Sequence, residues 1–332
     1  MLNLTNRRYT GSKQKLADWL IERISYHCTG DSFLEIFAGT SVVTSLIAPK
    51  MRKIMLNDNL QASKVIYTAF YLAEEYDSEK LANFRQKVVE SANLPSGYFT
   101  ENYGGKYFSV NDCKKIEFIR NLLETERSRF SAKEYAILLT SLIYSMDKCA
   151  NTVGHFDAYI KTAEIADKFH FDLIKPLNFP NTAVEIYNED ANQLAKKITA
   201  DIVYIDPPYN SRQYCQFYHI YETLVRWDNP ELFGVALKPQ ARLLSEYCRT
   251  KAPAVFADLI NSLKCRYIAV SYNNTYQSKS KSSRNKITLE EIESILTKKG
   301  NLQTFSKPHK FFNAGKTEFD NHLEYLFIVE VK

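Results

Sequence analysis

The sequence predicts an α/β fold in which an open, mainly parallel sheet is interrupted by a long helical insertion. Strand-length apolar runs alternate with helical segments over residues 11–56, and the same alternation returns from residue 183 onward. The stretch between them has helical periodicity without strand–helix alternation. We therefore expect an α/β domain formed by residues 1–60 and 182–332, with an inserted, mainly helical domain at residues 61–181.

The first part of the chain has the pattern of a strand, a tight turn and a helix. Residues 11–28 predict a helix for which Ser12 is available as the N-cap. A strand is predicted at residues 32–37, followed by a turn at residues 38–41 and a helix that continues to Ile47. The second strand follows at residues 53–56.

In the insertion, helical periodicity predicts helices at residues 61–75, 78–92, 111–126 and 132–149. Two polar, aromatic segments, residues 97–106 and residues 151–161, are expected to be surface loops, the second as a turn with an exposed strand.

The part of the chain after the insertion predicts three strands, three helices and a closing hairpin. The strands are expected at residues 183–187, 201–205 and 266–271, and the helices at residues 190–198, 213–227 and 252–263. The hairpin strands are expected at residues 302–312 and 322–331.

Composition and charge restrict the class of protein. Hydrophobic residues make up 45% and charged residues 24% of the 332, as in ordinary globular proteins. The net charge of +5 permits an anionic partner without requiring one. No apolar run is long enough to cross a bilayer and residues 1–8 lack a signal peptide pattern, so we expect no membrane association and a cytoplasmic protein. Six cysteines without C-x-x-C spacing, and six histidines that form no ligand pattern with them, predict no metal site.

The strongest chemical signal is the run Asp206-Pro207-Pro208-Tyr209, directly after the strand at residues 201–205. The carboxyl ends of strands are where open α/β sheets bind ligands. An aromatic amine is a poor nucleophile, and two acceptors aimed at its hydrogens would favour charge development on its nitrogen during methylation. Asp206 supplies one acceptor and the Pro207 carbonyl could supply the other. The Tyr209 ring can stack on the aromatic ring that carries the amine. The alternative is a strand that simply ends in a Pro-Pro turn. Asp-Pro alone is common and would be a weak signal, whereas an apolar strand followed by Asp-Pro-Pro-Tyr is much rarer and favours a functional site.

A second signal lies in the first strand–helix turn. Gly39 lets a ligand approach the backbone closely, and the start of the following helix favours an anionic group. Asp58 ends the next strand about 20 residues further on, where an acid binds ribose hydroxyls in dinucleotide folds.

These motifs, in this order and together with the segment Arg7-Arg8-Tyr9-Thr10-Gly11-Ser12-Lys13, resemble the D12-class (alpha-group) adenine-N6 DNA methyltransferases of Dam and type II restriction–modification type. The resemblance covers nearly the whole chain. It implies a Rossmann-like class I methyltransferase sheet with an inserted helical target-recognition domain. It also implies direct methyl transfer from S-adenosyl-L-methionine to a flipped-out adenine in double-stranded DNA.

The resemblance also implies roles for individual residues. The catalytic residues would be Asp206, Pro207 and Tyr209. The cofactor-binding residues would be Tyr9, Gly11 and Lys13 at the methionine part, Glu35, Phe37 and Gly39 in the cofactor loop, Asp58 at the ribose, and Asp190 near the adenine ring. Ser41 stands where the family pattern F-x-G-x-G has its second glycine. Because serine can stand at a helix N-cap, we expect cofactor binding to survive with a weaker affinity.

The expected DNA contacts lie outside these motifs. The run Asn210-Ser211-Arg212-Gln213-Tyr214 is similar to a family subset in which DPPY is followed by N-[ST]-R-Q-Y, and it makes Arg212 and Tyr214 candidate DNA contacts. Lys161 in the insertion, with Lys279 and Lys281 in the basic, serine-rich segment 277–286, are candidate phosphate contacts. His219 is expected to be a packed side chain.

The partners and the alternatives also follow from this resemblance. We expect the modification enzyme of a restriction–modification system, with a cognate restriction endonuclease encoded separately, acting as a monomer or weak dimer in a bacterial cytoplasm beside the nucleoid. The alternatives are a methyltransferase on RNA adenine or guanine, a cytosine-N4 enzyme (which would usually carry serine in place of Asp206), and a catalytically inactive DNA-binding specificity protein.

Overall fold

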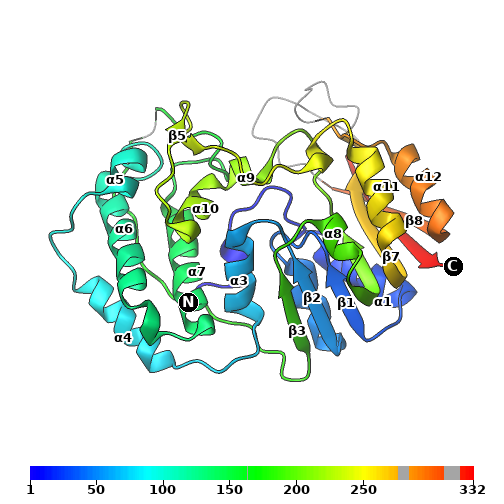
Figure 1. Cartoon of the computed structure of the whole chain (residues 1–332), viewed down its shortest axis with the longest axis horizontal. Helices are drawn as coiled ribbons and strands as arrows, with labels where there is room; N and C mark the ends of the chain where they lie inside the picture. The colour runs from blue at the N-terminus through cyan, green and yellow to red at the C-terminus, as the bar shows by residue number, and fades with distance from the viewer. Residues whose placement is uncertain (163, 276–283, 310–321) are drawn as a thin grey trace. The chain divides into compact units, whose positions relative to one another are not determined.

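The computed structural model describes the whole chain except residues 163, 276–283 and 310–321, and within it the chain forms two compact units (Figure 1). The helical unit comprises Met1–Ser12, Leu60–Pro180 and Cys215–Arg242. The sheet unit comprises Lys13–Asn59, Asn181–Tyr214 and Leu243–Lys332. The breaks near residues 60 and 181 lie next to the expected boundaries, but sequence analysis did not anticipate the grouping of the first twelve residues and of Cys215–Arg242 with the helices.

The sheet unit is built on one seven-stranded sheet with the order β3-β2-β1-β4-β7-β9-β8. Its strands are β1 (Ser32–Glu35), β2 (Lys53–Asn57), β3 (Ala183–Tyr187), β4 (Thr199–Ile205), β7 (Lys264–Asn273), β8 (Gly300–Pro308) and β9 (Leu323–Val331). The first five strands in the sheet order are parallel, whereas β9 runs antiparallel to β7 and to β8. The strands predicted for the α/β domain and its closing hairpin are confirmed within the described residues. Because β9 is antiparallel, its first residues lie at the same edge as the carboxyl ends of the parallel strands.

Helices cover both faces of this sheet (Figure 1). On one face α1 packs against α2, and on the other α11 packs against α8 and α12. The helices and short 3-10 turns are α1 (Ala17–His27), α2 (Val42–Ile47), η2 (Ala48–Lys50), α8 (Ala191–Ala195), η4 (Glu246–Cys248), α11 (Ala252–Ser262) and α12 (Leu289–Lys299). Helix α12 was not predicted, although Thr288 and Glu291 form a capping box at its start.

Because side chains alternate along a strand, one face of the sheet carries apolar core residues and the other carries polar residues. Leu34, Val203 and Val270 all face the apolar core that α8, α11 and α12 cover. The alternate residues point to the opposite face, so Glu35 on β1 lies beside Tyr204 on β4, its partner in the register. Polar residues of neighbouring strands thereby share one face near the carboxyl edge.

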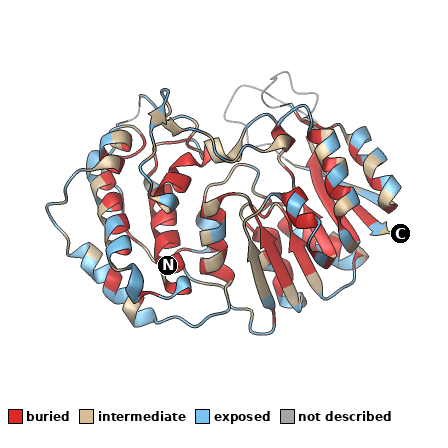
Figure 2. Cartoon of the chain, viewed as in Figure 1, coloured by how far each residue is buried: buried red, intermediate tan, exposed pale blue. Residues whose placement is uncertain are grey.

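The helical unit packs around α7, of which fourteen of eighteen residues are buried (Figure 2). Its long helices begin at side-chain caps: Asp77 for α4, Ser109 for α6, and a Ser131–Glu134 capping box for α7. The elements are η1 (Leu4–Asn6), α3 (Gln61–Tyr71), α4 (Ser78–Val89), α5 (Tyr98–Tyr103), α6 (Val110–Thr125), η3 (Arg127–Arg129), α7 (Ala132–Cys149), α9 (Tyr214–Phe217), α10 (His219–Arg226), β5 (Leu232–Phe233) and β6 (Lys238–Pro239).

The first predicted surface loop, residues 97–106, is instead mostly the short helix α5. The Glu117 carboxylate accepts hydrogen bonds from the backbone N–H groups of Gly97, Phe99 and Thr100, which satisfies the start of this helix. Phe99 and Tyr103 are fully buried. These two aromatic side chains are therefore core residues of the helical unit and not surface residues.

Three further expectations are corrected. Residues 151–161 contain no strand, and the Asn151 side chain closes this segment by donating to the carbonyls of Lys106 and Ile160. The first helix begins at Ala17, after turns, and not near Ser12. The helix predicted at residues 213–227 is interrupted at Tyr218 and ends at Trp227, which has a positive φ of 52°. Of the helices in the described part of the chain, none combines the length and apolar character that crossing a membrane requires.

Candidate active site

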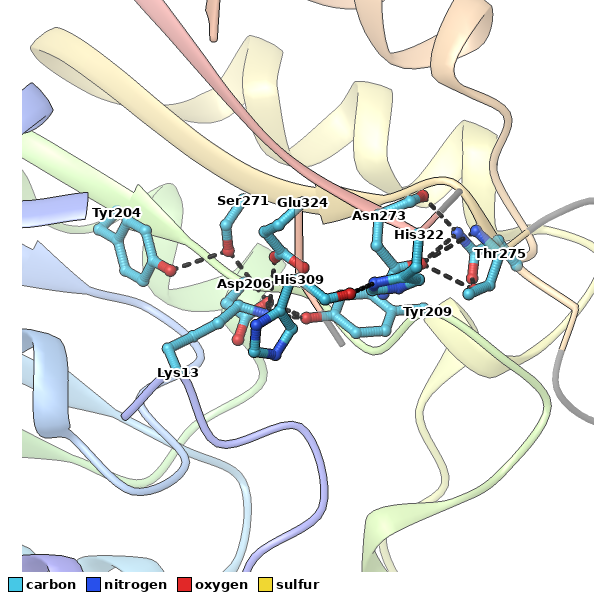
Figure 3. A network of polar contacts seen from close by, with 11 residues as sticks. Lys13, Tyr204, Asp206, Tyr209, Ser271, Asn273, Thr275, His309, His322 and Glu324 are labelled. Atoms are coloured by element: carbon cyan, nitrogen blue, oxygen red, sulfur yellow. Dashed lines mark hydrogen bonds and ion pairs between the residues drawn. The ribbon is translucent and has the colours of Figure 1, made fainter. Parts of the chain in front are cut away.

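Asp206 follows the end of β4, and one of its two carboxylate oxygens collects all of its protein contacts (Figure 3). Oδ1 accepts hydrogen bonds from the Tyr209 hydroxyl at 2.5 Å and from the Ser271 hydroxyl at 3.1 Å, and lies 3.0 Å from Lys13 Nζ. The Tyr204 hydroxyl donates in turn to Ser271 Oγ at 2.8 Å. No described residue donates to Oδ2. One oxygen of Asp206 is therefore held in place, while the other keeps its capacity to accept.

Lys13 joins Asp206 to a second carboxylate (Figure 3). Its Nζ lies 3.0 Å from Glu324 Oε1 as well as 3.0 Å from Asp206 Oδ1, and it donates to the Tyr209 hydroxyl. Lys13 is 6% exposed and Glu324 2% exposed. Glu324 is the second residue of the antiparallel strand β9, which explains how it reaches the edge where β4 ends.

Burial and charge act against each other in this cluster. Burial disfavours the Lys13 ammonium, but Asp206 and Glu324 outweigh that effect and raise the pKa of Lys13 above its ordinary value. Burial raises the pKa of Glu324 to about 7, and the neighbouring Asp206 adds to this shift while Lys13 opposes it. Lys13 is therefore a permanent cation, whereas Glu324 can change charge near neutral pH.

Tyr209 is held by a residue of β7 and by the backbone of Lys286. The Tyr209 ring packs edge-on against Tyr272 with centroids 5.2 Å apart, and the Tyr209 carbonyl accepts from Lys286 N at 2.7 Å. Pro207 is buried, and its carbonyl accepts no hydrogen bond from the described residues. Asp206 Oδ2 and the Pro207 carbonyl are thus two open acceptors on consecutive residues.

Buried polar groups anchor the segments that flank this site (Figure 3). Thr275 Oγ1 bonds to the Asn273 side chain at 2.7 Å and to the Asn285 side chain at 2.6 Å. Asn285 Nδ2 donates to the Asn273 carbonyl at 2.7 Å. Directly after β8 and directly before β9, His309 N donates to the His322 carbonyl at 3.1 Å. Burial lowers the pKa of both histidines, and the Lys13 charge adds to this shift. The hydrogen bond between His322 Nδ1 and the His309 carbonyl, at 2.7 Å, opposes the shift in His322.

The turn after β1 has the conformation that a close backbone approach requires. Gly39 has φ of 49° and Ser41 has φ of 56°, so two residues of this turn occupy the left-handed region. Ser41 holds the N-cap position of α2, as expected, but its hydroxyl donates to the Thr40 carbonyl at 2.7 Å and does not cap the helix. A glycine would adopt the Ser41 conformation without strain. Phe37 is half-buried and packs edge-on against Tyr247, with centroids 5.0 Å apart.

Two side chains at the end of β2 hold this turn. Asp58 Oδ2 accepts from Gly39 N at 3.1 Å, so the predicted ribose-binding acid also fixes the turn. Asn57 donates to the Ile36 carbonyl at 3.0 Å and to the Glu189 carbonyl at 3.1 Å, which ties together the ends of β1, β2 and β3. Sequence analysis did not select Asn57, although an amide at the end of a buried strand is a recognisable signal.

The remaining two predicted cofactor residues of the sheet unit differ in exposure. Asp190 is exposed and caps α8 by accepting from Gln193 N at 3.1 Å. Glu35 is buried, and Thr44 donates to Oε2 through both its backbone N at 3.0 Å and its hydroxyl at 2.5 Å. Burial raises the pKa of Glu35 to about 8 despite these bonds from Thr44. Glu35 therefore fixes the start of α2 on β1.

The other two predicted cofactor residues, Tyr9 and Gly11, belong to the helical unit. There the Tyr9 ring stacks on Tyr218, with centroids 4.6 Å apart, and Thr10 N donates to the Tyr218 hydroxyl at 2.7 Å. Gly11 is exposed with φ of 82°, a conformation that favours glycine.

The candidate DNA contacts are distributed over both units. Arg212 is exposed, and its backbone N bonds to Asn210 Oδ1 at 3.0 Å. Tyr214 is half-buried at the start of α9, and Lys161 is exposed in the helical unit. Lys279 and Lys281 lie outside the described residues. His219 is a packed side chain as expected, buried with Nε2 3.0 Å from the Phe156 carbonyl, and burial lowers its pKa to about 4.

Comparisons with known proteins decide the family. The family model for the D12 class N6 adenine-specific DNA methyltransferases matches residues 9–255. The chain belongs to this family. Among curated relatives, it is 31% identical to the type II methyltransferase M.FokI of Planomicrobium okeanokoites over 97% of this chain and 52% of that protein. It is 29% identical to M.NlaIII of Neisseria lactamica, covering 97% of this chain and 98% of that one. It is 30% identical to M.CviAII of Paramecium bursaria Chlorella virus 1, covering 98% of each.

Within the sheet unit of this D12-class family member, the turn at Phe37–Gly39 and the run Asp206-Pro207-Pro208-Tyr209 follow the neighbouring parallel strands β1 and β4. The chain spans about half the length of M.FokI and nearly all of the other two relatives. Sequence analysis identified Asp206, Tyr209 and Lys13 but missed Ser271 and Glu324, which contact them directly or through Lys13.

Proposed function

We propose that this protein is a site-specific methyltransferase that transfers the methyl group of S-adenosyl-L-methionine to N6 of adenine in double-stranded DNA. In a cell it would be the modification enzyme of a restriction–modification system, protecting sites that a separate endonuclease cleaves. Membership of the D12 class and the similarity to type II methyltransferases support this proposal.

The single observation that carries the proposal is the unequal use of the two Asp206 oxygens. Three protein groups hold Oδ1, and Oδ2 is left to accept, next to the open carbonyl of Pro207. An exocyclic amino group has two hydrogens and needs two acceptors to develop positive charge on nitrogen. Asp206 and Pro207 would bind that group and orient it, and the Tyr209 ring would hold the base by stacking.

The residues of the first turn fit S-adenosyl-L-methionine. Two residues with positive φ, Gly39 and Ser41, keep the backbone turn open to a ligand, and Asp58 lies at the end of the next parallel strand. Phe37, Asp58 and Asp190 would hold the nucleoside part, with Glu35 supporting the loop and Tyr9, Gly11 and Lys13 near the methionine part. When bound, this cofactor supplies a methyl group on a positively charged sulfur.

A base inside a duplex is stacked and its amino group cannot meet the methyl donor in line, so the adenine would be flipped out of the duplex. We assign target recognition to the helical unit, with Lys161 contacting phosphate. Arg212 and Tyr214, which follow Asp206-Pro207-Pro208-Tyr209 closely in the chain, would contact the flipped nucleotide or its neighbours.

The test is to incubate the protein with duplex DNA and methyl-labelled S-adenosyl-L-methionine, and then to digest the DNA to nucleosides. Label in N6-methyldeoxyadenosine is the expected result. Label in N4-methylcytosine, label only when RNA replaces DNA, or no label at all would contradict the proposal. Sequencing methylated genomic DNA from cells that express the protein would then identify the target sequence.

A further inference from the structure

Glu324 is a buried carboxylate that sequence analysis did not connect with the site. It contacts Lys13 and not Asp206, and Lys13 lies at the same distance, 3.0 Å, from each carboxylate. Three formal charges therefore share one buried cluster: two negative and one positive. If Glu324 were absent or protonated, Lys13 alone would neutralise Asp206.

We propose that Glu324 is a positioning residue that keeps the Asp206 cluster net negative, by sharing the charge of Lys13 while Asp206 binds the amino group. This inference rests on the proposed function. Positive charge develops on the adenine nitrogen during methylation, and an acceptor whose charge is already cancelled by a lysine stabilises it less. With Glu324 ionised, Lys13 holds Asp206 Oδ1 in place without cancelling the charge of the cluster.

The surroundings of Glu324 support this role. Glu324 faces Lys13 of the N-terminal segment and three residues around the end of β4, namely Tyr204, Asp206 and Tyr209. The charge of Glu324 raises the pKa of both tyrosines. In the sheet register Glu324 lies between Asn273 on β7 and Lys307 on β8, and Lys307 is exposed. His309 and His322 also feel the charge of Lys13, but burial lowers their pKa values, so Lys13 is the buried cation of this described set near neutral pH. Burial places the Glu324 pKa at about 7, so its charge changes in the range where such an enzyme would work.

The sign of the pH effect follows. Below about pH 7 Glu324 binds a proton, so the charge of Lys13 neutralises Asp206 alone. Methyl transfer slows because Asp206 then stabilises the positive charge on the amino group less. Above that pH the cluster is net negative and the rate reaches a plateau. Glu35, with a pKa raised to about 8 by burial, is the other nearby carboxylate that titrates in this range, so it must be separated from Glu324 in the experiment.

The experiment measures single-turnover methylation of duplex DNA between pH 5.5 and 9 for the wild type, Glu324→Gln, Glu324→Asp and Glu35→Gln. The exposed Glu330 of the same strand gives the matched control Glu330→Gln. We expect Glu324→Gln to lower the plateau rate roughly 10- to 100-fold and to abolish the acid limb near pH 7. Glu324→Asp should restore the limb and part of the rate, while Glu35→Gln and Glu330→Gln should leave the limb in place.

A second readout does not depend on turnover. Infrared difference spectra of the protein without DNA should show one carboxyl group protonating near pH 7 that is absent from Glu324→Gln and present in Glu35→Gln. An unaltered acid limb in Glu324→Gln, or no such carboxyl signal in the wild type, would overturn the role of Glu324. Should Glu324→Gln fail to fold, a wild-type rate that stays flat across pH 7 would overturn it equally. A wild type that transfers no methyl group, yet shows the carboxyl signal, would instead overturn the proposed function and with it the catalytic meaning of the cluster.

Discussion

Two buried cations lie six residues apart in the chain, Arg7 in the helical unit and Lys13 in the sheet unit. They are almost equally buried, with exposed fractions of 5% and 6%. Lys13 lies between two carboxylates, whereas Arg7 lies among aromatic rings. Its guanidinium is 4.6 Å from the Tyr9 ring centre, 5.4 Å from that of Tyr218 and 5.3 Å from that of Tyr221. None of its three nitrogens has a hydrogen-bond partner in the described chain.

The two environments differ in whether their charge can change with pH. The tyrosine rings around Arg7 attract a cation, and burial raises the pKa of Tyr218 to about 12 and that of Tyr221 well above its ordinary value, so Arg7 is a fixed part of the packing. The carboxylates around Lys13 include one, Glu324, whose pKa of about 7 lets the cluster change its charge. We therefore assign chemistry to the Lys13 cluster and a structural role to the Arg7 stack, and the following changes test that assignment.

The largest effect is expected on activity. Asp206→Ala removes the carboxylate that receives the amino group and should reduce methyl transfer by about 10³-fold. Cofactor binding, measured by calorimetry, should persist, because the proposed cofactor residues other than Lys13 do not contact Asp206. The control is Asp31→Ala, whose side chain is 70% exposed and forms only a weak pair with Arg52. Retained methylation in Asp206→Ala would refute the assigned role.

The next effect concerns stability. Lys13→Met leaves the buried Glu324 and the half-buried Asp206 without a cation, which should destabilise the protein by about 3–5 kcal/mol at pH 8. A carboxylate with a raised folded-state pKa contributes stability at low pH that is lost as the pH rises through that pKa. The loss caused by Lys13→Met should therefore be smaller at pH 5.5, where Glu324 is protonated. Denaturant unfolding at both pH values, beside the exposed control Lys15→Met, measures it. Equal losses at the two pH values would contradict the predicted coupling.

Arg7→Met should behave differently. No carboxylate would be left unpaired, and the lost cation–π contacts are offset by removing a buried charge. We expect a change in the free energy of unfolding of no more than about 2 kcal/mol, equal at pH 5.5 and pH 8. A larger loss, or one that varies with pH, would show that Arg7 has an anionic partner and that the contrast with Lys13 is wrong.

The smallest effects come from two buried tyrosines, one beside each cation. Tyr144→Phe removes a 3.0 Å hydrogen bond to the Leu4 carbonyl, and Tyr204→Phe removes the 2.8 Å bond to Ser271. Each should cost about 1 kcal/mol of stability. Only Tyr204→Phe should also slow methylation, by a few-fold, because Ser271 then loses the group that orients it toward Asp206. Thermal unfolding and single-turnover rates together distinguish the two, and a slowed Tyr144→Phe would contradict the division.

The sequence predicted most of the sheet because the information is local. An apolar run that ends in Asp206-Pro207-Pro208-Tyr209 specifies both a strand and what stands at its end, and the same is true of the turn at Phe37 to Ser41. Helix α5 escaped prediction because its start is stabilised by Glu117, a carboxylate from another helix. The sequence of residues 97–106 alone therefore does not predict this contact.

The rest of the site could not be predicted for a similar reason. Ser271 is an ordinary strand residue, and Glu324 stands near the start of a strand rather than at its end. Their positions beside Asp206 follow from strand order and direction, which are properties of the whole sheet. Strand alternation would place them on the correct face only once the antiparallel register of β9 is known.

The position of β9 between β7 and β8 has a consequence for biosynthesis. Until a ribosome has added residues 323–331, β7 has an open edge, β8 has no partner and Lys13 lacks one of its two carboxylates. A nascent chain that is complete only to residue 320 would already carry the motifs described above and all of the residues that match the family, 9–255, and still lack a finished sheet. Premature stop codons upstream of β9 should therefore yield aggregating protein, and not partially active enzyme.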